Sequence, residues 1–334
     1  MTTALITGAS GLVGSHLVER LQQDGWQLRA LVRERASAGW LAARGVELRH
    51  GDTRDAAAFA RAADGVQYVF HCAAAITPRG GWEAFRAPNI DGTRSAIEAA
   101  AGAGARLLHL SSVAVYGPDG RYALSSDGDL QELRPLRPLP EAAWYARSKR
   151  ESEMLVMDAH HAGRVWATTV RPCVIYGPRD RQFVPRVAAV LRLPLVPRIG
   201  SGRARLAIVH ARSVAEVAIR AVTSEIAGGR AYNVTNDPPI TVNEFYDAAQ
   251  AGLGRRVRWI PIHGGAVQSA MGALGLAMRA LRVPGSSLLN ARSLDFLLAD
   301  NPFSSERARR ELGWTSGIDP RAAVAEAFRF CARG

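Results

Sequence analysis

Short apolar runs alternate with helical segments through the first half of this 334-residue chain. The runs are Ala4 to Thr7, Leu28 to Val32, Val46 to Arg49, Tyr68 to Phe70, Leu107 to Leu110 and Ala167 to Val170. Strands that are apolar nearly throughout are buried on both faces, which is typical of a parallel sheet with helices on either side. The pattern therefore predicts an α/β fold built on a doubly wound parallel sheet.

Proline and glycine become frequent after Pro172, which indicates a second, smaller and mixed region. Two later apolar runs, Ala207 to His210 and Ala231 to Val234, look like strands that return to the first sheet. We therefore assign residues 1–176 and 206–236 to the larger region, and residues 177–205 and 237–334 to the smaller one. Hydrophobic residues make up 48% of the chain and charged residues 22%, so both regions are expected to fold.

A glycine-rich turn follows the first apolar run and opens a helix that extends to about Gln23. The turn reads Thr7-Gly8-Ala9-Ser10-Gly11-Leu12-Val13-Gly14. Glycines at such a turn let a pyrophosphate approach the backbone N–H groups of a helix N-terminus, where the helix dipole favours anions. The turn predicts a dinucleotide site contacted by Gly8, Ser10, Gly11, Leu12 and Gly14. The alternative is a tight strand-to-helix turn without a ligand.

The end of the second apolar run indicates which dinucleotide binds. An NAD enzyme commonly offers an acidic residue there to the ribose hydroxyls, but this chain has Val32 followed by Arg33. A guanidinium suits a 2′-phosphate, and Arg35 could assist, so the sequence favours NADP over NAD. The alternative is that Arg33 is one more solvated arginine in a chain of formal net charge +12.

Tyr145 and Lys149 stand four residues apart at the start of a helical run through about His160, so they share one helix face. An ammonium near a phenol lowers the phenol pKa from its usual value of about 10, which would let Tyr145 exchange protons near neutrality. Of the 42 lysine and arginine residues, Lys149 is the one lysine. The pair is therefore predicted to be catalytic, with an incidental surface pair as the alternative.

Further motifs follow the glycine turn in order along the chain. They are Gly51-Asp52, His71-Cys72-Ala73-Ala74, Asn89 with Gly92-Thr93, Ser111-Ser112 with Val115-Tyr116-Gly117, Tyr145 with Lys149, and Arg171-Pro172 with Tyr176-Gly177-Pro178. This series resembles the extended short-chain dehydrogenase/reductases of the NAD-dependent epimerase/dehydratase superfamily. The resemblance implies that the larger region is a dinucleotide-binding Rossmann domain and that the smaller region binds the substrate.

The resemblance also implies roles for single residues. Ser112 corresponds to the catalytic serine that hydrogen-bonds the substrate oxygen, with Ser111 as the adjacent alternative. Asn89 is expected to be structural first. The remaining cofactor contacts are expected from Asp52, Thr53, Ala73, Ala74, Lys149 and Pro172.

Two departures from the family's motifs disfavour two of its reactions. Val113 and Ala114 follow Ser112 where dehydratases carry an acidic pair, which disfavours dehydration. Leu206 stands where nucleotide-sugar epimerases often place an arginine, which disfavours binding of a nucleotide-sugar diphosphate. The segments Gly264 to Val283 and Asn301 to Trp314 are similar to the 3β-hydroxysteroid dehydrogenase and dihydroflavonol reductase branch. Five apolar residues flank the motifs and could form an apolar wall for the substrate, although each could equally belong to the core: Ile76, Trp82, Val113, Trp144 and Phe183.

We therefore predict an NADP-dependent oxidoreductase that transfers hydride between the cofactor and a secondary alcohol or ketone of a bulky apolar substrate, steroid-, terpenoid- or polyketide-like. A nucleotide-sugar epimerase is the alternative. A non-catalytic NADP-binding regulatory protein is a remote one, because fold does not fix function.

The remaining expectations concern partners and location. The cysteines Cys72, Cys173 and Cys331 lie far apart, and no secretory leader is evident, so we expect no disulfide, no metal site and a cytoplasmic protein. The arginines are scattered, so no nucleic acid is expected. Residues 264–278 are too polar for a membrane span and are expected to form a helix, with a peripheral membrane contact as the alternative. The resemblance implies a homodimer that packs through the helices of residues 89–101 and Tyr145.

Overall fold

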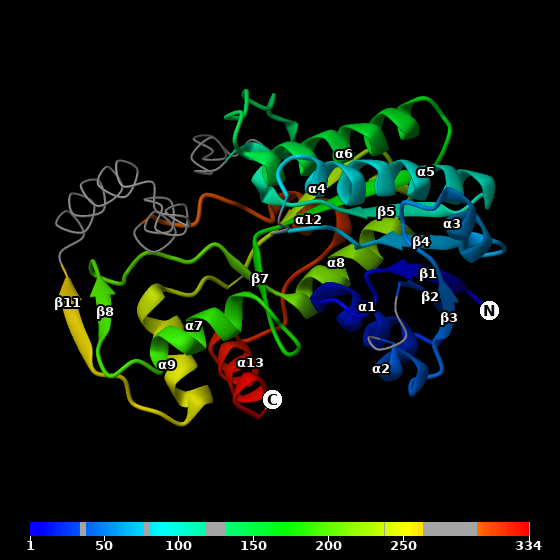
Figure 1. The fold of residues 1–334 in the computed structure, drawn as a ribbon. Helices are drawn as coiled ribbons and strands as arrows, with labels where there is room; N and C mark the ends of the chain where they lie inside the picture. The colour runs from blue at the N-terminus through cyan, green and yellow to red at the C-terminus, as the bar shows by residue number, and fades with distance from the viewer. Residues whose placement is uncertain (34–37, 77–79, 118–130, 237, 263–298, 334) are drawn as a thin grey trace. The chain divides into compact units, whose positions relative to one another are not determined.

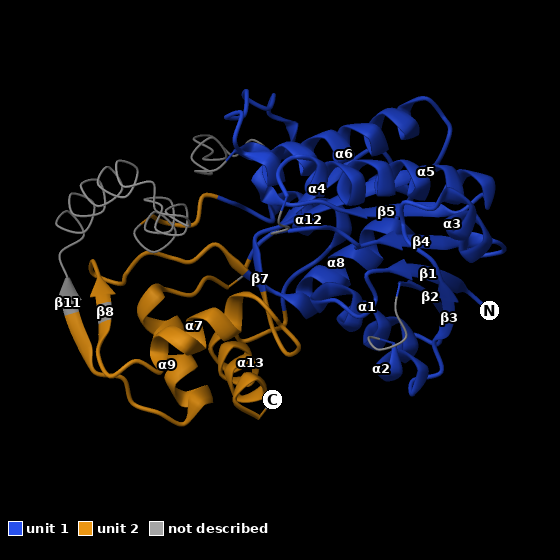
Figure 2. Cartoon of the chain, in the orientation of Figure 1, with its two compact units in different colours: residues 1–175, 209–235, 303–316 blue, residues 176–208, 236–302, 317–334 orange. Residues whose placement is uncertain are grey.

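The computed structural model describes residues 1–33, 38–76, 80–117, 131–236, 238–262 and 299–333 (Figure 1). The chain divides into two compact units (Figure 2). Unit 1 contains residues 1–175, 209–235 and 303–316, and unit 2 contains residues 176–208, 236–302 and 317–334. Residues 303–316 belong to unit 1, whereas their place in the chain predicts the smaller region.

Unit 1 is built on a seven-stranded sheet with the order β10-β6-β5-β4-β1-β2-β3. Its strands are β1 (Thr3–Thr7), β2 (Gln27–Val32), β3 (Glu47–His50), β4 (Tyr68–His71), β5 (Arg106–Leu110), β6 (Ala167–Pro172) and β10 (Ala231–Val234). All six strand pairings in this sheet are parallel. The predicted doubly wound sheet is confirmed. Its order reverses between β1 and β4, and ligands of such sheets bind at the carboxyl ends of the strands beside such a reversal.

Helices cover both faces of this sheet (Figure 1). One face carries α3 (Ala56–Ala63), α5 (Gly92–Gly102) and α6 (Trp144–His161), which share a buried core with the strands. The other face carries α1 (Leu12–Gln23) and α8 (Ala211–Thr223), which pack against each other. The strands are therefore covered on both sides, which explains why their sequences are apolar nearly throughout.

The rest of unit 1 consists of short elements and one late helix. The short elements are α2 (Gly39–Ala42), α4 (Glu83–Arg86), the π-helical turn η2 (Ala87–Asp91), and the 3-10 turns η3 (Val113–Tyr116), η5 (Gln131–Leu133) and η6 (Glu225–Ala227). The late helix, α12 (Glu306–Leu312), contacts β10. Tyr232 Oη donates to Glu311 Oε2 at 2.8 Å, and Arg307 Nη1 donates to the Ala231 carbonyl at 3.3 Å. These contacts explain why residues 303–316 return to unit 1.

Unit 2 contains α7 (Phe183–Leu191), α9 (Val242–Leu253) and α13 (Pro320–Arg333), packed around a core that includes Phe245 and Phe328. The helix α9 begins with a capping box between Thr241 and Glu244. A two-stranded parallel sheet pairs β8 (Val196–Ile199) with β11 (Trp259–Ile262). Within the described ranges, no helix is both long and apolar enough to cross a bilayer.

Two predictions about the later part of the chain have different outcomes. The run Ala231 to Val234 does return to the first sheet, as β10 beside β6. The prediction for Ala207 to His210 is wrong, because β9 (Ile208–His210) pairs with β7 (Val174–Tyr176) in a separate two-stranded sheet, while β10 takes the position beside β6. The helix predicted for residues 264–278 lies outside the described residues.

Candidate active site

The predicted site residues lie at the carboxyl ends of six neighbouring strands of the unit 1 sheet. The turn after β1 holds Gly8, Ser10 and Gly11, and α1 holds Leu12 and Gly14. Arg33 follows β2, Asp52 and Thr53 follow β3, Ala73 and Ala74 follow β4, and Ser112 follows β5. Pro172 is the last residue of β6, and Tyr145 and Lys149 lie in the first turns of α6. The fold thus brings all of them to one edge of the sheet.

The glycine turn is shaped by backbone contacts that leave no room for side chains. Gly8 has a φ of +68°. A Cβ on Gly8 would lie 2.9 Å from the Ala73 nitrogen, and a Cβ on Gly14 would lie 2.2 Å from the Gly8 carbonyl oxygen. Gly11 is the N-cap of α1, and within the described residues no side chain caps this helix. The first-turn N–H groups of α1 are therefore oriented to bind an anion.

The ends of β2 and β3 place Arg33 and Asp52 near each other. The Arg33 side chain is exposed, and its charge acts on Asp52. Arg54 donates to both carboxylate oxygens of Asp52 at 2.9 Å, and this contact lowers the pKa of Asp52. Thr53, which follows β3, lies close to the start of α5, because a Cβ on Gly92 would be 3.0 Å from Thr53 Oγ1. Contacts from Arg33, Asp52 and Thr53 to a cofactor remain predictions, and Arg35 lies outside the described residues.

Buried hydrogen bonds tie the end of β4 to the glycine turn and to α5. Thr7 Oγ1 accepts from the Ala73 N–H at 3.2 Å and contacts His71 Nδ1 at 2.9 Å. The other ring nitrogen, Nε2, lies 3.2 Å from Thr93 Oγ1, which donates to the Asn89 carbonyl. Burial lowers the pKa of His71 to about 3, so the ring is neutral, and these partners favour a proton on Nε2.

Asn89 has a structural role in the described residues. Its Oδ1 accepts from the Ala75 N–H at 2.7 Å, and its Nδ2 donates to the Ala75 carbonyl and to Ser148 Oγ, both at 2.9 Å. The side chain is buried within the π-helical turn η2. Asn89 therefore holds the segment after β4 against α6, the helix that carries Tyr145.

Ser112 and Tyr145 are far apart in sequence but meet in the structure. Ser112 is the N-cap of η3, where its Oγ accepts from the Ala114 N–H at 3.1 Å, and it interacts with the Tyr145 side chain. Burial raises the pKa of Tyr145, and the Ser112 hydrogen bond acts in the opposite direction. The expectation that an ammonium lowers this pKa is therefore wrong for the chain as described, because desolvation of the phenolate is the larger effect.

Lys149 lies one helical turn after Tyr145 and is buried, and its Nζ donates to the Leu110 carbonyl at 2.6 Å. Burial lowers its pKa to about 8. The ammonium thus lies beside Leu110, the last residue of β5, and Ser111 and Ser112 follow Leu110 in the chain. The alternative serine, Ser111, has a buried Oγ without a hydrogen-bond partner among the described residues.

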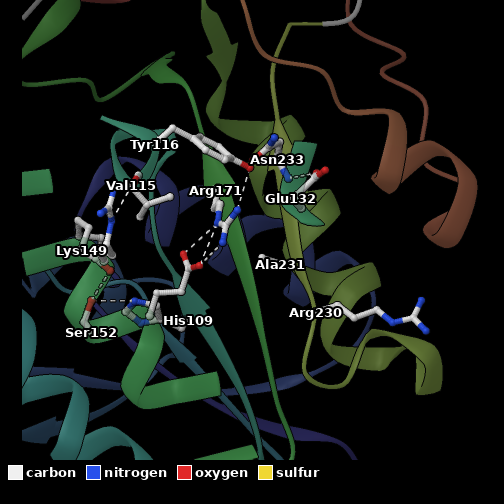
Figure 3. Close-up of polar contacts among 12 residues, drawn as sticks. His109, Val115, Tyr116, Glu132, Lys149, Ser152, Arg171, Arg230, Ala231 and Asn233 are labelled. Carbon is white, nitrogen blue, oxygen red and sulfur yellow. Dashed lines mark hydrogen bonds and ion pairs between the residues drawn. The ribbon is translucent and has the colours of Figure 1, made fainter. Parts of the chain in front are cut away.

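An ion-pair network beside this site was missed by the sequence analysis. Arg171 Nε lies 3.0 and 3.1 Å from the two carboxylate oxygens of Glu153, and its Nη1 donates to Tyr116 Oη at 2.8 Å. The network continues from Tyr116 Oη, which donates a hydrogen bond to Asn233 Oδ1 (Figure 3). The available signal was the spacing, since Glu153 follows Lys149 by four residues on one helix face.

The five side chains that could form an apolar wall lie in different environments. Ile76 and Trp144 are exposed apolar side chains, and the Phe85 ring lies 6.4 Å from that of Trp144 and 6.5 Å from that of Tyr145. Trp82 is stacked by Arg147, and Val113 packs beside Tyr116. Phe183 packs in the core of unit 2. A role for any of them in substrate binding remains a prediction.

The residues of unit 1 fit a bound dinucleotide. The uncapped α1 terminus suits a pyrophosphate, the turn is closed to side chains, and the neutral His71 and Asn89 hold the neighbouring backbone in place. The part of the chain that the structure describes contains no group of three or more His, Cys, Asp or Glu side chains arranged for a metal ion.

Comparison with known proteins adds independent information. The model of the NAD dependent epimerase/dehydratase family matches residues 4–235. A ceramide reductase of Caulobacter vibrioides is 32% identical over 289 residues, which covers 86% of this chain and 76% of that protein.

Two further relatives are similar over nearly the whole chain. A 4-hydroxy-2-methyl-3-oxo-4-farnesyl-3,4-dihydroquinoline-1-oxide ketoreductase of Stigmatella aurantiaca is 29% identical over 317 residues, covering 94% of this chain and 92% of that protein. A 3 beta-hydroxysteroid dehydrogenase/Delta 5-->4-isomerase of Mycobacterium tuberculosis is 28% identical over 337 residues, covering 96% and 88%. The family match spans every predicted site residue from the glycine turn to Pro172.

Proposed function

Since this chain belongs to the NAD dependent epimerase/dehydratase family and is an NAD(P)-dependent oxidoreductase, we propose that it transfers hydride between NADP(H) and a secondary alcohol or ketone of a bulky apolar molecule. The observation that carries the proposal is the buried Lys149 ammonium, which lies one turn beyond Tyr145 on α6 and donates to the Leu110 carbonyl, directly before Ser111 and Ser112 in the chain. The side chains of Ser112, Tyr145 and Lys149 combine a hydrogen-bond donor, a proton donor and a positive charge at the carboxyl edge of the sheet.

In the proposed mechanism, the bound nicotinamide supplies or accepts the hydride. Ser112 binds the substrate oxygen, and Tyr145 donates its proton to that oxygen during reduction or accepts one during oxidation. The raised pKa of Tyr145 keeps the phenol protonated at neutral pH, which is the form that reduction of a ketone requires. Lys149 would hold the ribose of the bound cofactor and would supply the compact positive charge that a planar guanidinium does not provide.

The preference for NADP is supported by Arg33, which follows Val32 at the end of β2 in place of an acidic residue. The apolar substrate is supported by relatives whose names refer to ceramide, a farnesylated dihydroquinoline oxide and a hydroxysteroid. The exposed Ile76 and Trp144 offer apolar surface on the segments next to Asn89 and Tyr145.

We also propose a cytoplasmic homodimer that packs through α5 and α6. These helices lie side by side on one face of the unit 1 sheet, and α6 exposes the large apolar side chain of Met154. Light scattering at micromolar concentration tests the dimer, and a monomer would refute it.

A substrate panel tests the reaction. The full chain is incubated with NADPH or NADH and a series of apolar ketones of increasing size, and nicotinamide absorbance is followed. We expect stoichiometric loss of NADPH with bulky ketones and slower loss of NADH. A nucleotide-sugar epimerase would instead interconvert sugar nucleotides without net consumption of added cofactor. Absence of NADPH or NADH consumption with every ketone, together with absence of oxidation of the matching alcohols, would reject the proposal.

A further inference from the structure

Arg171 and Glu153 form an ion pair in the interior of unit 1, with side-chain exposures of 7% and 6%. Arg171 Nε is shared between both carboxylate oxygens, and Nη2 also donates to Glu153 Oε1. Glu153 lies on α6, one turn beyond Lys149, and Arg171 lies on β6 directly before Pro172. Loss of one partner would leave an uncompensated charge in the interior, which is why such pairs are sensitive to substitution.

The same guanidinium also reaches the turn that carries Ser112. Arg171 Nη1 donates to Tyr116 Oη at 2.8 Å, and Tyr116 Oη donates to Asn233 Oδ1 at 3.0 Å (Figure 3). Tyr116 is the last residue of η3, and Ser112 is the N-cap of that turn. Arg171 therefore contacts α6 through Glu153 and η3 through Tyr116.

A second contact joins the same two elements. Arg150, the residue after Lys149, donates from Nε to the Val115 carbonyl at 3.0 Å. The turn η3 is thus fixed to α6 at Val115 and, through Arg171, at Tyr116. Two points of attachment therefore hold the turn that carries Ser112 against the helix that carries Tyr145.

We propose that Glu153 and Arg171 are positioning residues: their ion pair fixes α6, with Tyr145 and Lys149, against η3, with Ser112, and holds the Glu153 carboxylate one helical turn beyond the Lys149 ammonium. The inference deepens the proposed function, on which its catalytic meaning rests. Neither residue is assigned contact with substrate or cofactor.

The electrostatic part follows from the groups around Lys149. His71 and Cys72 approach from the end of β4, His109 from β5, Glu153 from α6 itself, and Arg171 from β6 beyond Glu153, while Tyr145 lies one turn before Lys149 on α6. Burial lowers the pKa values of both histidines and raises that of Cys72 to about 12, so these three groups are neutral at pH 7. Among these groups, Glu153 is the anion that favours the charged form of Lys149.

The one lysine of the chain allows a direct test that needs no substrate. The full chain is produced with lysine labelled at the ε-carbon, so that one NMR resonance reports the Lys149 ammonium, and the resonance is titrated with pH. Glu153→Gln is expected to move the Lys149 midpoint down by about one pH unit, because a nearby opposite charge is lost. An unchanged midpoint in a folded Glu153→Gln protein would overturn the electrostatic part.

A second triad, in which Arg307 and Tyr232 are buried and Glu311 is partly buried, supplies the matched control. Arg307 and Glu311 form an ion pair with exposures of 8% and 18%, and Tyr232 donates to Glu311. This triad joins α12 to β10, and among the described residues its hydrogen bonds and ion pairs reach neither α6 nor η3. Glu311→Gln is expected to lower the thermal midpoint as Glu153→Gln does, without moving the Lys149 titration. Equal Lys149 shifts in both variants would mean a general effect of destabilisation and would reject the proposal.

The geometric part is tested with Tyr116→Phe, which removes one hydroxyl and keeps the ion pair. With a ketone that the wild type reduces, kcat is expected to fall about tenfold while the Kd for NADPH stays unchanged, since small misplacements of reacting groups are costly. An unchanged kcat would overturn the geometric part. This test remains valid if the Glu153→Gln protein fails to fold. If the wild type neither reduces a ketone nor oxidises a matching alcohol, the proposed function fails on its own, and the Lys149 titration still decides the electrostatic part.

Discussion

The turn between β1 and α1 forms its part of the candidate site from backbone atoms, whereas η3 and α6 form theirs from buried side chains. At the turn, Gly8 and Gly14 leave no space for a Cβ, and no side chain among the described residues caps α1. On α6, the important atoms are the Tyr145 hydroxyl and the Lys149 ammonium, whose pKa values are shifted by burial. The turn should therefore be sensitive to added volume and the helix to altered charge or lost protons.

The largest expected effect separates these two parts most clearly. Tyr145→Phe removes the proton donor while keeping the ring that packs beside Phe85. We expect kcat to fall about 1000-fold, within the range of general acid catalysis, with an unchanged Kd for NADPH measured by fluorescence. Tyr68→Phe, at the amino end of β4, is the control and should retain full activity. Full activity in Tyr145→Phe would reject the assigned mechanism.

Adding one methyl group to the turn should give the opposite result. In Gly14→Ala the new Cβ would meet the Gly8 carbonyl oxygen at 2.2 Å and the Ala9 Cα at 2.7 Å, both backbone atoms that a side-chain rotation does not move. We expect loss of measurable NADPH binding and destabilisation by about 1–3 kcal/mol, measured by urea unfolding. Gly102→Ala in α5 has open space around its Cβ and should not destabilise the protein. A normal NADPH affinity in Gly14→Ala would show that the turn tolerates volume.

The same contrast explains what the sequence could predict. The parallel sheet and the glycine turn follow from local patterns, because apolar runs and glycine spacing act through the backbone of adjacent residues. The meeting of Ser112 with Tyr145 was available only through family resemblance, since no local rule joins residues so far apart. The Arg171–Glu153 pair and the direction of the Tyr145 pKa depend on tertiary burial, which the sequence does not display.

The late segments show the same limit. Ala207 to His210 has the composition of a strand, but composition does not specify which strand it pairs with, and β10 occupies the edge beside β6. Residues 303–316 return to unit 1 through Trp314, which is fully buried, and through α12 contacts with β10. Long-range returns of this kind depend on packing surfaces that form only after the sheet has assembled.

The protonation of Lys149 on α6 should determine how kcat/KM depends on pH. Lys149 has a pKa of about 8, lowered by burial, so the ammonium is present below that pH and is lost as the pH rises through it. We expect kcat/KM with NADPH to decline above about pH 8 in the wild type. Lys149→Arg keeps a positive charge at high pH but lacks a compact ammonium, so its rate should be about 100-fold lower and without this decline. A wild-type rate that is constant to pH 10 would contradict a required ammonium.

The smallest expected effect concerns cofactor choice, and it lies at the edge of the backbone-built part. Arg33 is exposed and follows β2, where its guanidinium would meet a 2′-phosphate that NADH lacks. Arg33→Gln should weaken NADPH binding about tenfold, the loss of one charge-assisted hydrogen bond, and leave NADH binding unchanged. Arg49→Gln, an exposed arginine on β3 that pairs with Glu47, is the control for a general loss of positive charge. Equal weakening of both cofactors by Arg33→Gln would assign Arg33 to general electrostatic attraction, because a specific 2′-phosphate contact acts on NADPH alone.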